Sequence, residues 1–330
     1  MPTPSFVSPA AAPEDWRRLQ GEFHRFLASF HPTWGSAQAK SLFQQTERGW
    51  LYSLVWRPTA GDALGLAFAQ DTPSGSRIHG VWVEPADSRS LARFLHDFER
   101  EMGRPVVVIT DVLPGMELAD QVSFFEERGY WHRAKVLMRR EMRRGVLSPP
   151  GSSEIRPLLR SDIPELVTLY SRAYHERPGE FWVWTAPDPV ADAELTWRSL
   201  LDPSGEWVPN HRAEASFVWV ANKKVVGAVA VEDRPSGVPY ISDLIVDPEH
   251  HRHGIGRRLM ERTLLELSQG PSEVVELAAI QYGAPYRLYE KIGFREVAPP
   301  DGRYDGHWVL GPDPTRGLRG GFSGPRATKD

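Results

Sequence analysis

The chain of 330 residues is too long for one small domain and suits two domains of ordinary size, and a hydrophobic content of 41% can fill both cores. It has no cysteine, which excludes disulfides, thiolate metal sites and cysteine nucleophiles. The formal net charge is -4 with both signs well mixed, so we expect no nucleic-acid partner, because such partners select basic surfaces.

The amino terminus, MPTPSFVSPAAAPEDW, has neither a basic start nor a continuous apolar core, so it does not have the pattern of a secretory signal. No apolar run elsewhere reaches the roughly 20 residues needed to cross a bilayer. We therefore expect a cytoplasmic protein with no membrane partner. The sequence is compatible with either a monomer or a homodimer.

The first half predicts two helices, three strands, and then a helix, a strand, a helix and a strand. Apolar residues at helical spacing, from Trp16 to Phe30, indicate the first helix, and His31-Pro32 ends it. The turn RPTAGD separates the first two strands. The helices are expected at about 14–30, 36–48, 91–98 and 117–128, and the strands at 50–56, 63–70, 78–85, 105–110 and 131–142.

The same order of elements recurs after residue 154, so the chain has the pattern of a tandem repeat. The sequence VEP at 83–85 matches VDP at 246–248, and FFEERGY at 124–130 matches LYEKIGF at 288–294. The segment RRGVLSPPGSS between the copies is typical of a linker. We expect a first domain at 1–145, a linker at 146–153, a second domain at 154–311 and a disordered tail at 312–330.

Residues 240–260, YISDLIVDPEHHRHGIGRRLM, predict a buried strand, a turn, a basic loop with glycines, and an amphipathic helix. Gly254 and Gly256 let a ligand approach the backbone closely, and the amides at a helix start favour an anion. Arg252, Arg257 and Arg258 add positive charge. The segment therefore predicts a site for a phosphate-bearing ligand.

Two better-known phosphate motifs do not fit this loop, because it lacks the lysine of an NTPase loop and the third glycine of a dinucleotide-binding turn. The histidines at 250, 251 and 253 invite a metal interpretation. Only Glu249 stands near them as a carboxylate, and there is no cysteine, so we expect no metal and interpret them as solvated residues near phosphate.

The loop resembles the pyrophosphate loop of the GNAT superfamily of acetyltransferases, which reads Arg/Gln-x-x-Gly-x-Gly/Ala after a strand ending in Val-Asp-Pro. Here the motif begins at His251 in place of Arg or Gln. The later sequence YRLYEKIGF at 286–294 resembles the Leu-Tyr-Glu-Lys-x-Gly-Phe ending of the same family. A tandem layout with one weaker copy is loosely similar to that of the mycothiol synthases.

The resemblance implies an α/β (α+β) protein of two tandem GNAT folds, each with a mixed, mostly antiparallel sheet flanked by helices. It implies acetyl-CoA as co-substrate, with Tyr289 as the general acid that protonates the leaving thiolate. Tyr282 stands where the family commonly has Asn. The backbone of Leu244, Ile245 and Val246 would contact the pantetheine arm, and the pyrophosphate would lie against His251, Arg252, His253, Gly254, Ile255, Gly256 and Arg257.

The first copy lacks the residues that carry this chemistry. After Pro85 comes ADSRSLARF, which has no glycine, and Phe125 stands at the tyrosine position. The spacing of the copies nevertheless agrees, with 40 residues (125 − 85) from Pro85 to Phe125 and 41 (289 − 248) from Pro248 to Tyr289. Because side chains would crowd the backbone cradle and phenylalanine cannot donate a proton, we expect a degenerate copy without acyl-CoA.

Two functions remain compatible with the sequence. The first is an acetyl-CoA-dependent N-acetyltransferase that acts on a small-molecule amine or a peptide amino terminus, with Asp243 or Glu232 as the proton acceptor. The second is a non-catalytic protein that binds acyl-CoA as a sensor or scaffold. The aromatic segment with Phe181, Trp182 and Trp184 either lines the acceptor pocket or packs beneath a long loop.

Overall fold

The structure is a computed structural model. It describes residues 5–30, 34–49, 51–58, 64–72, 75–103, 106–108, 113, 116, 118–142, 153–174, 189–201, 210–234, 237–281, 283–298 and 305–310. The predicted tail, most of the predicted linker and the aromatic segment at 181–184 lie outside these residues. The chain divides into two compact units, the first made of 1–134 with 305–330 and the second of 135–304.

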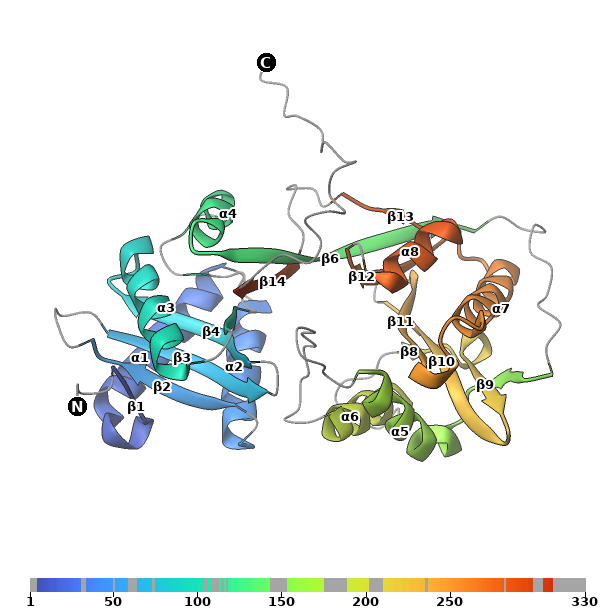
Figure 1. Cartoon of the computed structure of the whole chain (residues 1–330), viewed down its shortest axis with the longest axis horizontal. Helices are drawn as coiled ribbons and strands as arrows, with labels where there is room; N and C mark the ends of the chain where they lie inside the picture. Colours follow the sequence, from blue (N-terminus) through green and yellow to red (C-terminus); the bar gives the residue numbers. More distant parts are fainter. Residues whose placement is uncertain are drawn as a thin grey trace, which may run out of the picture. The chain divides into compact units, whose positions relative to one another are not determined.

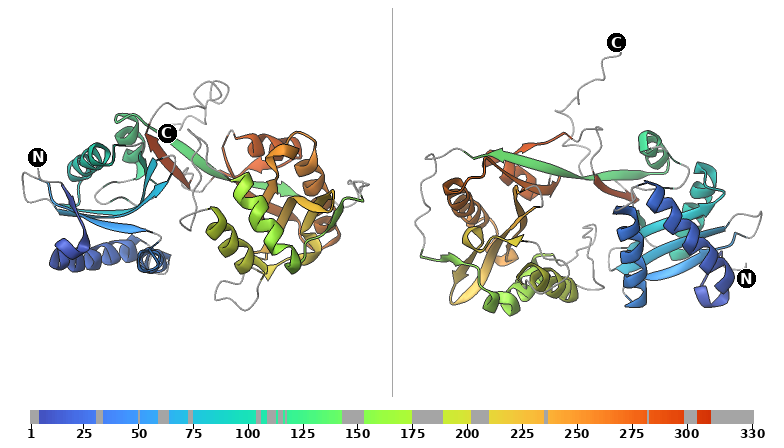
Figure 2. Two further views of the ribbon diagram at one scale, coloured as in Figure 1. Left: turned by 60° about the horizontal axis from the view of Figure 1, so that its bottom comes forward. Right: turned by 180° about the vertical axis from the view of Figure 1, so that it is seen from behind.

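The first unit is a mixed sheet with helices on both faces (Figures 1 and 2). Strands β1 to β4 are antiparallel neighbours, β5 runs parallel to β4, and β14 runs antiparallel to β5. The elements are β1 (Phe6–Val7), α1 (Pro13–Phe30), α2 (Trp34–Glu47), β2 (Tyr52–Trp56), β3 (Leu64–Thr72), β4 (Gly75–Glu84), α3 (Ser88–Met102), β5 (Val106–Val108), α4 (Leu118–Glu126), the first residues of β6 (Tyr130–Glu141) and β14 (Asp305–Leu310).

Alternation along β3 explains the two layers of this unit, because successive side chains of a strand point to opposite faces. Leu66 and Phe68 pack in the cluster that contains Phe23 of α1. Ala67 and Ala69 pack in the cluster that contains Phe94 of α3. Leu19, Phe23 and Leu27 of the first predicted helix are therefore core, and both faces of the sheet are covered.

The second unit has the same layered plan, with α5 and α6 on one face of its sheet and α7 on the other (Figures 1 and 2). Ala228, Ala230 and Ile245 pack with the α5 and α6 side chains, while a Cβ at Gly227 would meet Ile255 of α7 at 2.9 Å. The elements are β7 (Ile155–Pro157), α5 (Ile163–Ala173), α6 (Pro189–Leu201), β8 (Asn210–His211), β9 (Phe217–Ala221), β10 (Lys224–Asp233), β11 (Pro239–Val246), α7 (Ile255–Gln269), β12 (Val274–Ile280), α8 (Ala284–Lys291) and β13 (Arg295–Glu296).

The two units are not the two contiguous ranges expected from the sequence, because they exchange strands. Residues 135–141 of β6 pair antiparallel with β12, from Lys135 opposite Ile280 to Glu141 opposite Val274. The last strand of the chain, β14, pairs with β5 in the first unit. The fold class is as expected, but hydrophobic alternation identifies a strand without naming its partner.

Short elements account for the other differences from the sequence expectations. Strands β1, β8 and β13 have two residues each, and β1 and β8 were not anticipated. A two-residue strand is too short to show a period of two in its sequence. Within the part of the chain that the structure describes, no helix is long and apolar enough to span a membrane.

Candidate active site

A gap between two parallel strands lies at the centre of the second unit. Strands β11 and β12 pair only through Tyr240 with Glu276 and Ile241 with Leu277. Beyond that point β11 continues to Val246 and pairs with β10 on its other side. On the side that faces β12, the backbone N–H and C=O groups of residues 242–246 therefore take no part in the pairing of β11 with β12. This leaves an edge on which an extended ligand can form hydrogen bonds.

The loop after β11 presents backbone donors at the start of α7. Gly254 is the N-cap residue, with a left-handed φ of 79° and no side-chain cap. The first intrahelical bond of this turn is made by Arg258, whose N–H donates to the Gly254 carbonyl at 3.0 Å. The N–H groups of residues 255–257 come before this bond and therefore have no carbonyl acceptor within the helix. They and the helix dipole favour an anion.

Gly256 keeps open the space between this helix turn and the gap. A Cβ at this position would lie 3.5 Å from Val246, 3.7 Å from Leu288 and 3.8 Å from Leu244. An alanine would make ordinary contacts there. A longer side chain would extend toward the splayed part of β11, which is the path that a pantetheine arm would take.

The side chains predicted to hold the cofactor divide into two groups. His251 Nε2 lies 2.9 Å from the Val246 carbonyl, and Arg257 pairs with Glu261 at 2.7 Å, so the protein itself engages both. Arg252 and His253 are exposed. Ile245 and Ile255 are buried, so only their main chain can reach a ligand. Tyr282 lies outside the described residues.

One arginine of α5 holds the loop in place. Arg172 pairs with the buried Asp247 at 2.9 Å and with Glu249 at 3.1 Å. Asp247 also accepts a hydrogen bond from the Glu249 N–H at 3.0 Å. The Arg172 guanidinium thus bonds to two carboxylates at once, one through each terminal nitrogen. Because such charged hydrogen bonds have a defined geometry, the network orders the turn that leads into the Gly254 loop.

Tyr289 of α8 lies next to the acidic residue of β11 that the sequence singled out. Its side chain is buried, and its pKa is raised by that burial, by the charge of Asp243 and by Tyr240. A raised pKa keeps the phenol protonated through the physiological range, which a general acid requires. Asp243 therefore lies near enough to Tyr289 for its charge to raise the pKa of the phenol.

The two candidate bases have different surroundings. Asp243 accepts a hydrogen bond from the Tyr174 hydroxyl at 2.9 Å. Glu232 is half-buried, and burial raises its pKa while Arg234 opposes the shift. Asp243, and not Glu232, is among the groups whose charge acts on Tyr289. Asp243 is therefore the carboxylate nearer to the expected reaction.

Two further residues of this region were not anticipated from the sequence. Tyr174 ends α5 just before the aromatic segment, and no local pattern couples it to a strand 69 residues later. Glu276 is a buried carboxylate opposite Tyr240, paired with Arg139 of β6 at 2.8 Å. A glutamate in the interior of the apolar segment VVELAAI was the available signal for it.

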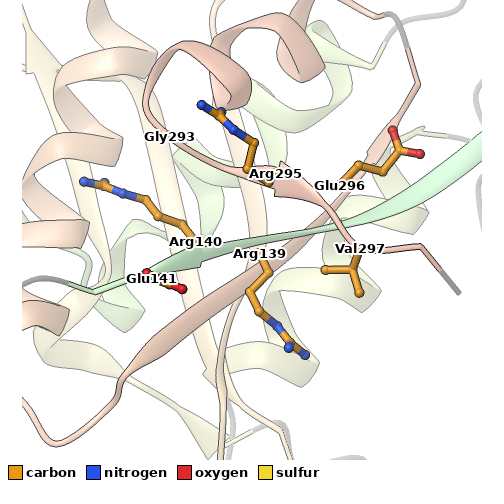
Figure 3. A pocket seen from close by; sticks show the side chains of 7 residues that line it. All are labelled: Arg139, Arg140, Glu141, Gly293, Arg295, Glu296 and Val297. Carbon is orange, nitrogen blue, oxygen red and sulfur yellow. The ribbon is translucent and has the colours of Figure 1, made fainter. Parts of the chain in front are cut away.

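A separate groove of about 430 Å³ lies at the other end of β12, between β6 and β13 (Figure 3). Arg140 and Arg295 extend to one side of β6 and Arg139 extends to the other (Figure 3). Arg139 is paired with Glu276, and Glu296 accepts a hydrogen bond from Tyr286 at 3.0 Å. The groove contains neither Tyr289 nor Asp243, so it is not the site of the expected chemistry.

The equivalent positions of the first unit are filled by the protein itself. Asp87 is the N-cap of α3, and its carboxylate accepts a hydrogen bond from the Ser90 N–H at 2.7 Å, which lowers the pKa of Asp87. Phe125 is fully buried and stacks on Trp308 of β14, with ring centroids 4.6 Å apart. Among the described residues of either unit, no cluster of His, Asp or Glu could hold a metal ion.

Residues 186–310 match the family model described as an acetyltransferase (GNAT) domain. The second unit therefore contains a GNAT domain, and the family resemblance expected from the two motifs is confirmed. No curated protein sequence matches the chain.

Three solved structures illustrate the structural similarity. A GCN5-related N-acetyltransferase from Sphaerobacter thermophilus is 15% identical, covers 93% of this chain and 95% of its own, and has a TM-score of 0.44. A tandem GNAT protein from the clavulanic acid biosynthesis pathway is also 15% identical, with coverages of 90% and 96% and a TM-score of 0.44. The ribosomal-protein-S18-alanine N-acetyltransferase from Escherichia coli is 25% identical over 47% of this chain and 91% of its own, with a TM-score of 0.33.

Proposed function

We propose that the protein is an acetyl-CoA-dependent N-acetyltransferase whose second unit transfers the acetyl group directly to an amine of a small molecule or a peptide amino terminus. The observation that carries the proposal is the alignment of three features in one unit. These are an uncapped helix start with a glycine cradle, a splayed pair of parallel strands, and a buried, protonated tyrosine beside a carboxylate.

Each feature has a part in the transfer. The N–H groups of residues 255–257 bind the pyrophosphate of acetyl-CoA, and the free edge of residues 242–246 orients its pantetheine arm. The expected contribution of Arg252 and His253 is positive charge near the phosphates. Held in this way, the thioester carbonyl lies between the Tyr289 hydroxyl and the incoming amine, which supplies the proximity that direct transfer needs.

The protons balance without a covalent enzyme intermediate. A carboxylate, Asp243 or Glu232, takes one proton from the ammonium form of the acceptor. The amine nitrogen then forms a bond to the carbonyl carbon as the C–S bond breaks. Tyr289 gives its proton to the leaving thiolate, and the second proton lost by the nitrogen restores the phenol.

The alternative is an acyl-CoA-binding sensor or scaffold without turnover. It has the same cradle and gap but needs no acid and no base. The buried Tyr289 with its raised pKa is the observation that favours the enzyme over this alternative.

Calorimetric titration with acetyl-CoA, followed by transfer to a panel of amines and short peptides, tests the proposal. We expect one site per chain and acetylated product detectable by mass spectrometry. Tyr289→Phe should lower turnover roughly 100-fold or more while the acetyl-CoA Kd changes less than twofold, because general acids contribute on that scale. Tyr286→Phe, on the same helix but bonded to Glu296, is the matched control and should retain turnover.

Binding without product on any acceptor would favour the sensor. Full turnover by Tyr289→Phe would contradict the acid assignment, and no binding of acetyl-CoA would contradict both functions.

A further inference from the structure

The last turn of α5 is attached to β11 and to the loop that follows it by two side chains. Tyr174, the C-cap residue of the helix, donates its hydroxyl proton to Asp243 Oδ1 at 2.9 Å. Arg172, two residues earlier, pairs with Asp247 at 2.9 Å. The two carboxylates are four residues apart on the chain. One helix end therefore holds both the expected cofactor loop and the acidic residue beside Tyr289.

Asp243 lies beside a β-bulge, on the face of the sheet that α5 and α6 cover. In the register of β10 with β11, Ala230 lies opposite Asp243 and the next residue, Val231, lies opposite Ile241. Ser242 is the extra residue, and its hydroxyl donates to the Ala230 carbonyl at 3.3 Å. Ala230, opposite Asp243, and Ile245, two residues further along β11, both pack with the side chains of α5 and α6. Ordinary alternation from Ile245 therefore places Asp243 on the face that these helices cover, and the bulge ends that alternation at Ser242.

The carboxylate of Asp243 lies near several buried or partly buried phenols. Tyr174 and Tyr289 both have a pKa raised first by burial, and the charge of Asp243 raises both further. The rings of Tyr170 and Tyr174 are tilted against each other, with centroids 4.5 Å apart, and Tyr240 adds to the effect on Tyr289. Charged groups on the neighbouring strands include Glu232 of β10 with Arg234 just after that strand, and Glu276 of β12 with Arg139 of β6.

We propose that Tyr174 is a positioning residue of the acetyl transfer, which holds the Asp243 carboxylate ionised and oriented so that Asp243, rather than Glu232, accepts the proton of the acceptor amine. The inference rests on the proposed function. A hydrogen bond donated to the charged form of a carboxylate favours that form, and the fixed donor also sets the orientation of the Asp243 carboxylate. The attachment of α5 through Arg172 keeps the phenol at a fixed distance from the strand.

The test compares pH–rate profiles of the full chain after an acceptor has been found in the amine and peptide panel. Tyr174→Phe removes only the donor. We expect the acid limb of kcat to move up by about one pH unit, because a carboxylate without its donor binds a proton more tightly. We also expect kcat at neutral pH to fall several-fold, with the acetyl-CoA Kd unchanged within twofold.

The first unit provides a matched control, since Tyr130 donates to Glu99 at 2.5 Å in a part-buried pair away from the Gly254 loop. Tyr130→Phe removes a similar hydrogen bond and should leave the profile unmoved. Asp243→Asn should abolish the acid limb, while Glu232→Gln should retain it.

The proposal is overturned if the acid limb of the pH–rate profile does not move in Tyr174→Phe. It is also overturned if Glu232→Gln, and not Asp243→Asn, abolishes that limb. If Tyr174→Phe does not fold, Asp243→Asn and Glu232→Gln decide the identity of the proton acceptor. If the unaltered protein transfers no acetyl group, it is the proposed function that fails, which is a separate result.

Discussion

The two copies differ most clearly at the start of one helix, where each satisfies the same backbone donors in a different way. In the first unit the Asp87 carboxylate caps α3 through the Ser90 N–H. In the second unit the N-cap is Gly254, which has no side chain to offer. A carboxylate and a phosphate compete for the same donors, so the self-capped helix has no vacancy for a cofactor. A helix start becomes a binding site when the chain leaves it uncapped.

The second difference lies at the tyrosine position. The charge of Asp243 acts on Tyr289, whereas Phe125 stacks on Trp308 of β14. In the first unit the Phe125 ring is part of the hydrophobic core, so this position contributes to the stability of the unit. The comparison predicts that changes at equivalent positions affect ligand binding in one unit and only stability in the other.

The largest expected effect concerns the strand exchange. A fragment of residues 154–311 lacks residues 135–141, which pair with β12 and bury Val136 and Met138 completely. The loss of two such side chains costs about 3–6 kcal/mol, a large part of the 5–15 kcal/mol that stabilises a typical domain. We expect this fragment to be unfolded by circular dichroism. The fragment 135–304 should fold and bind acetyl-CoA, and equal stability of the two would contradict the exchange.

The next effect is on the cradle. Gly256→Leu places a side chain against Val246, Leu244 and Leu288, in the expected path of the pantetheine arm. We expect acetyl-CoA affinity to fall about 100-fold, which corresponds to about 2.7 kcal/mol at 25 °C. The equivalent position in the first unit is Arg89, the second residue of α3 as Gly256 is of α7. Arg89→Leu should leave affinity unchanged by calorimetry, and a loss there would show that the first unit also binds.

A smaller effect concerns pH. The raised pKa of Tyr289 keeps its proton in place as the pH rises past the ordinary value for tyrosine, so the alkaline limb of turnover should lie above about pH 10. Asp243→Asn removes one of the causes, so the pKa of Tyr289 falls and the limb moves to lower pH. Direct titration of Tyr289 by ultraviolet difference spectra checks the shift. If the alkaline limb does not move in Asp243→Asn, the charge of Asp243 does not affect the pKa of Tyr289.

The smallest expected effect is on the capped helix. Asp87→Ala removes the acceptor for the Ser90 N–H and should lower the free energy of unfolding by about 1 kcal/mol, as measured by urea denaturation. Acetyl-CoA stoichiometry should stay at one per chain. A second site appearing in Asp87→Ala would mean that the cap alone had prevented binding.

Local chemistry explains why part of the site was predictable. Gly254, Gly256 and Tyr289 belong to motifs with fixed spacing, and a Cβ at Gly256 would lie near Val246 and Leu288. The absence of the equivalent glycines and tyrosine from the first copy can also be read from the sequence. Such features are short-range, because a turn, a helix start and a glycine depend on a few consecutive residues.

The sequence by itself thus determined the elements, their repeated order and the cradle. The tertiary structure alone decided which strands pair, so that β6 completes the second unit and β14 the first. It also decided which side chain meets Asp243 and that Arg139 pairs with Glu276. These contacts join residues far apart in the chain, and their selection depends on packing and on the pairing of buried charges, neither of which has a local period.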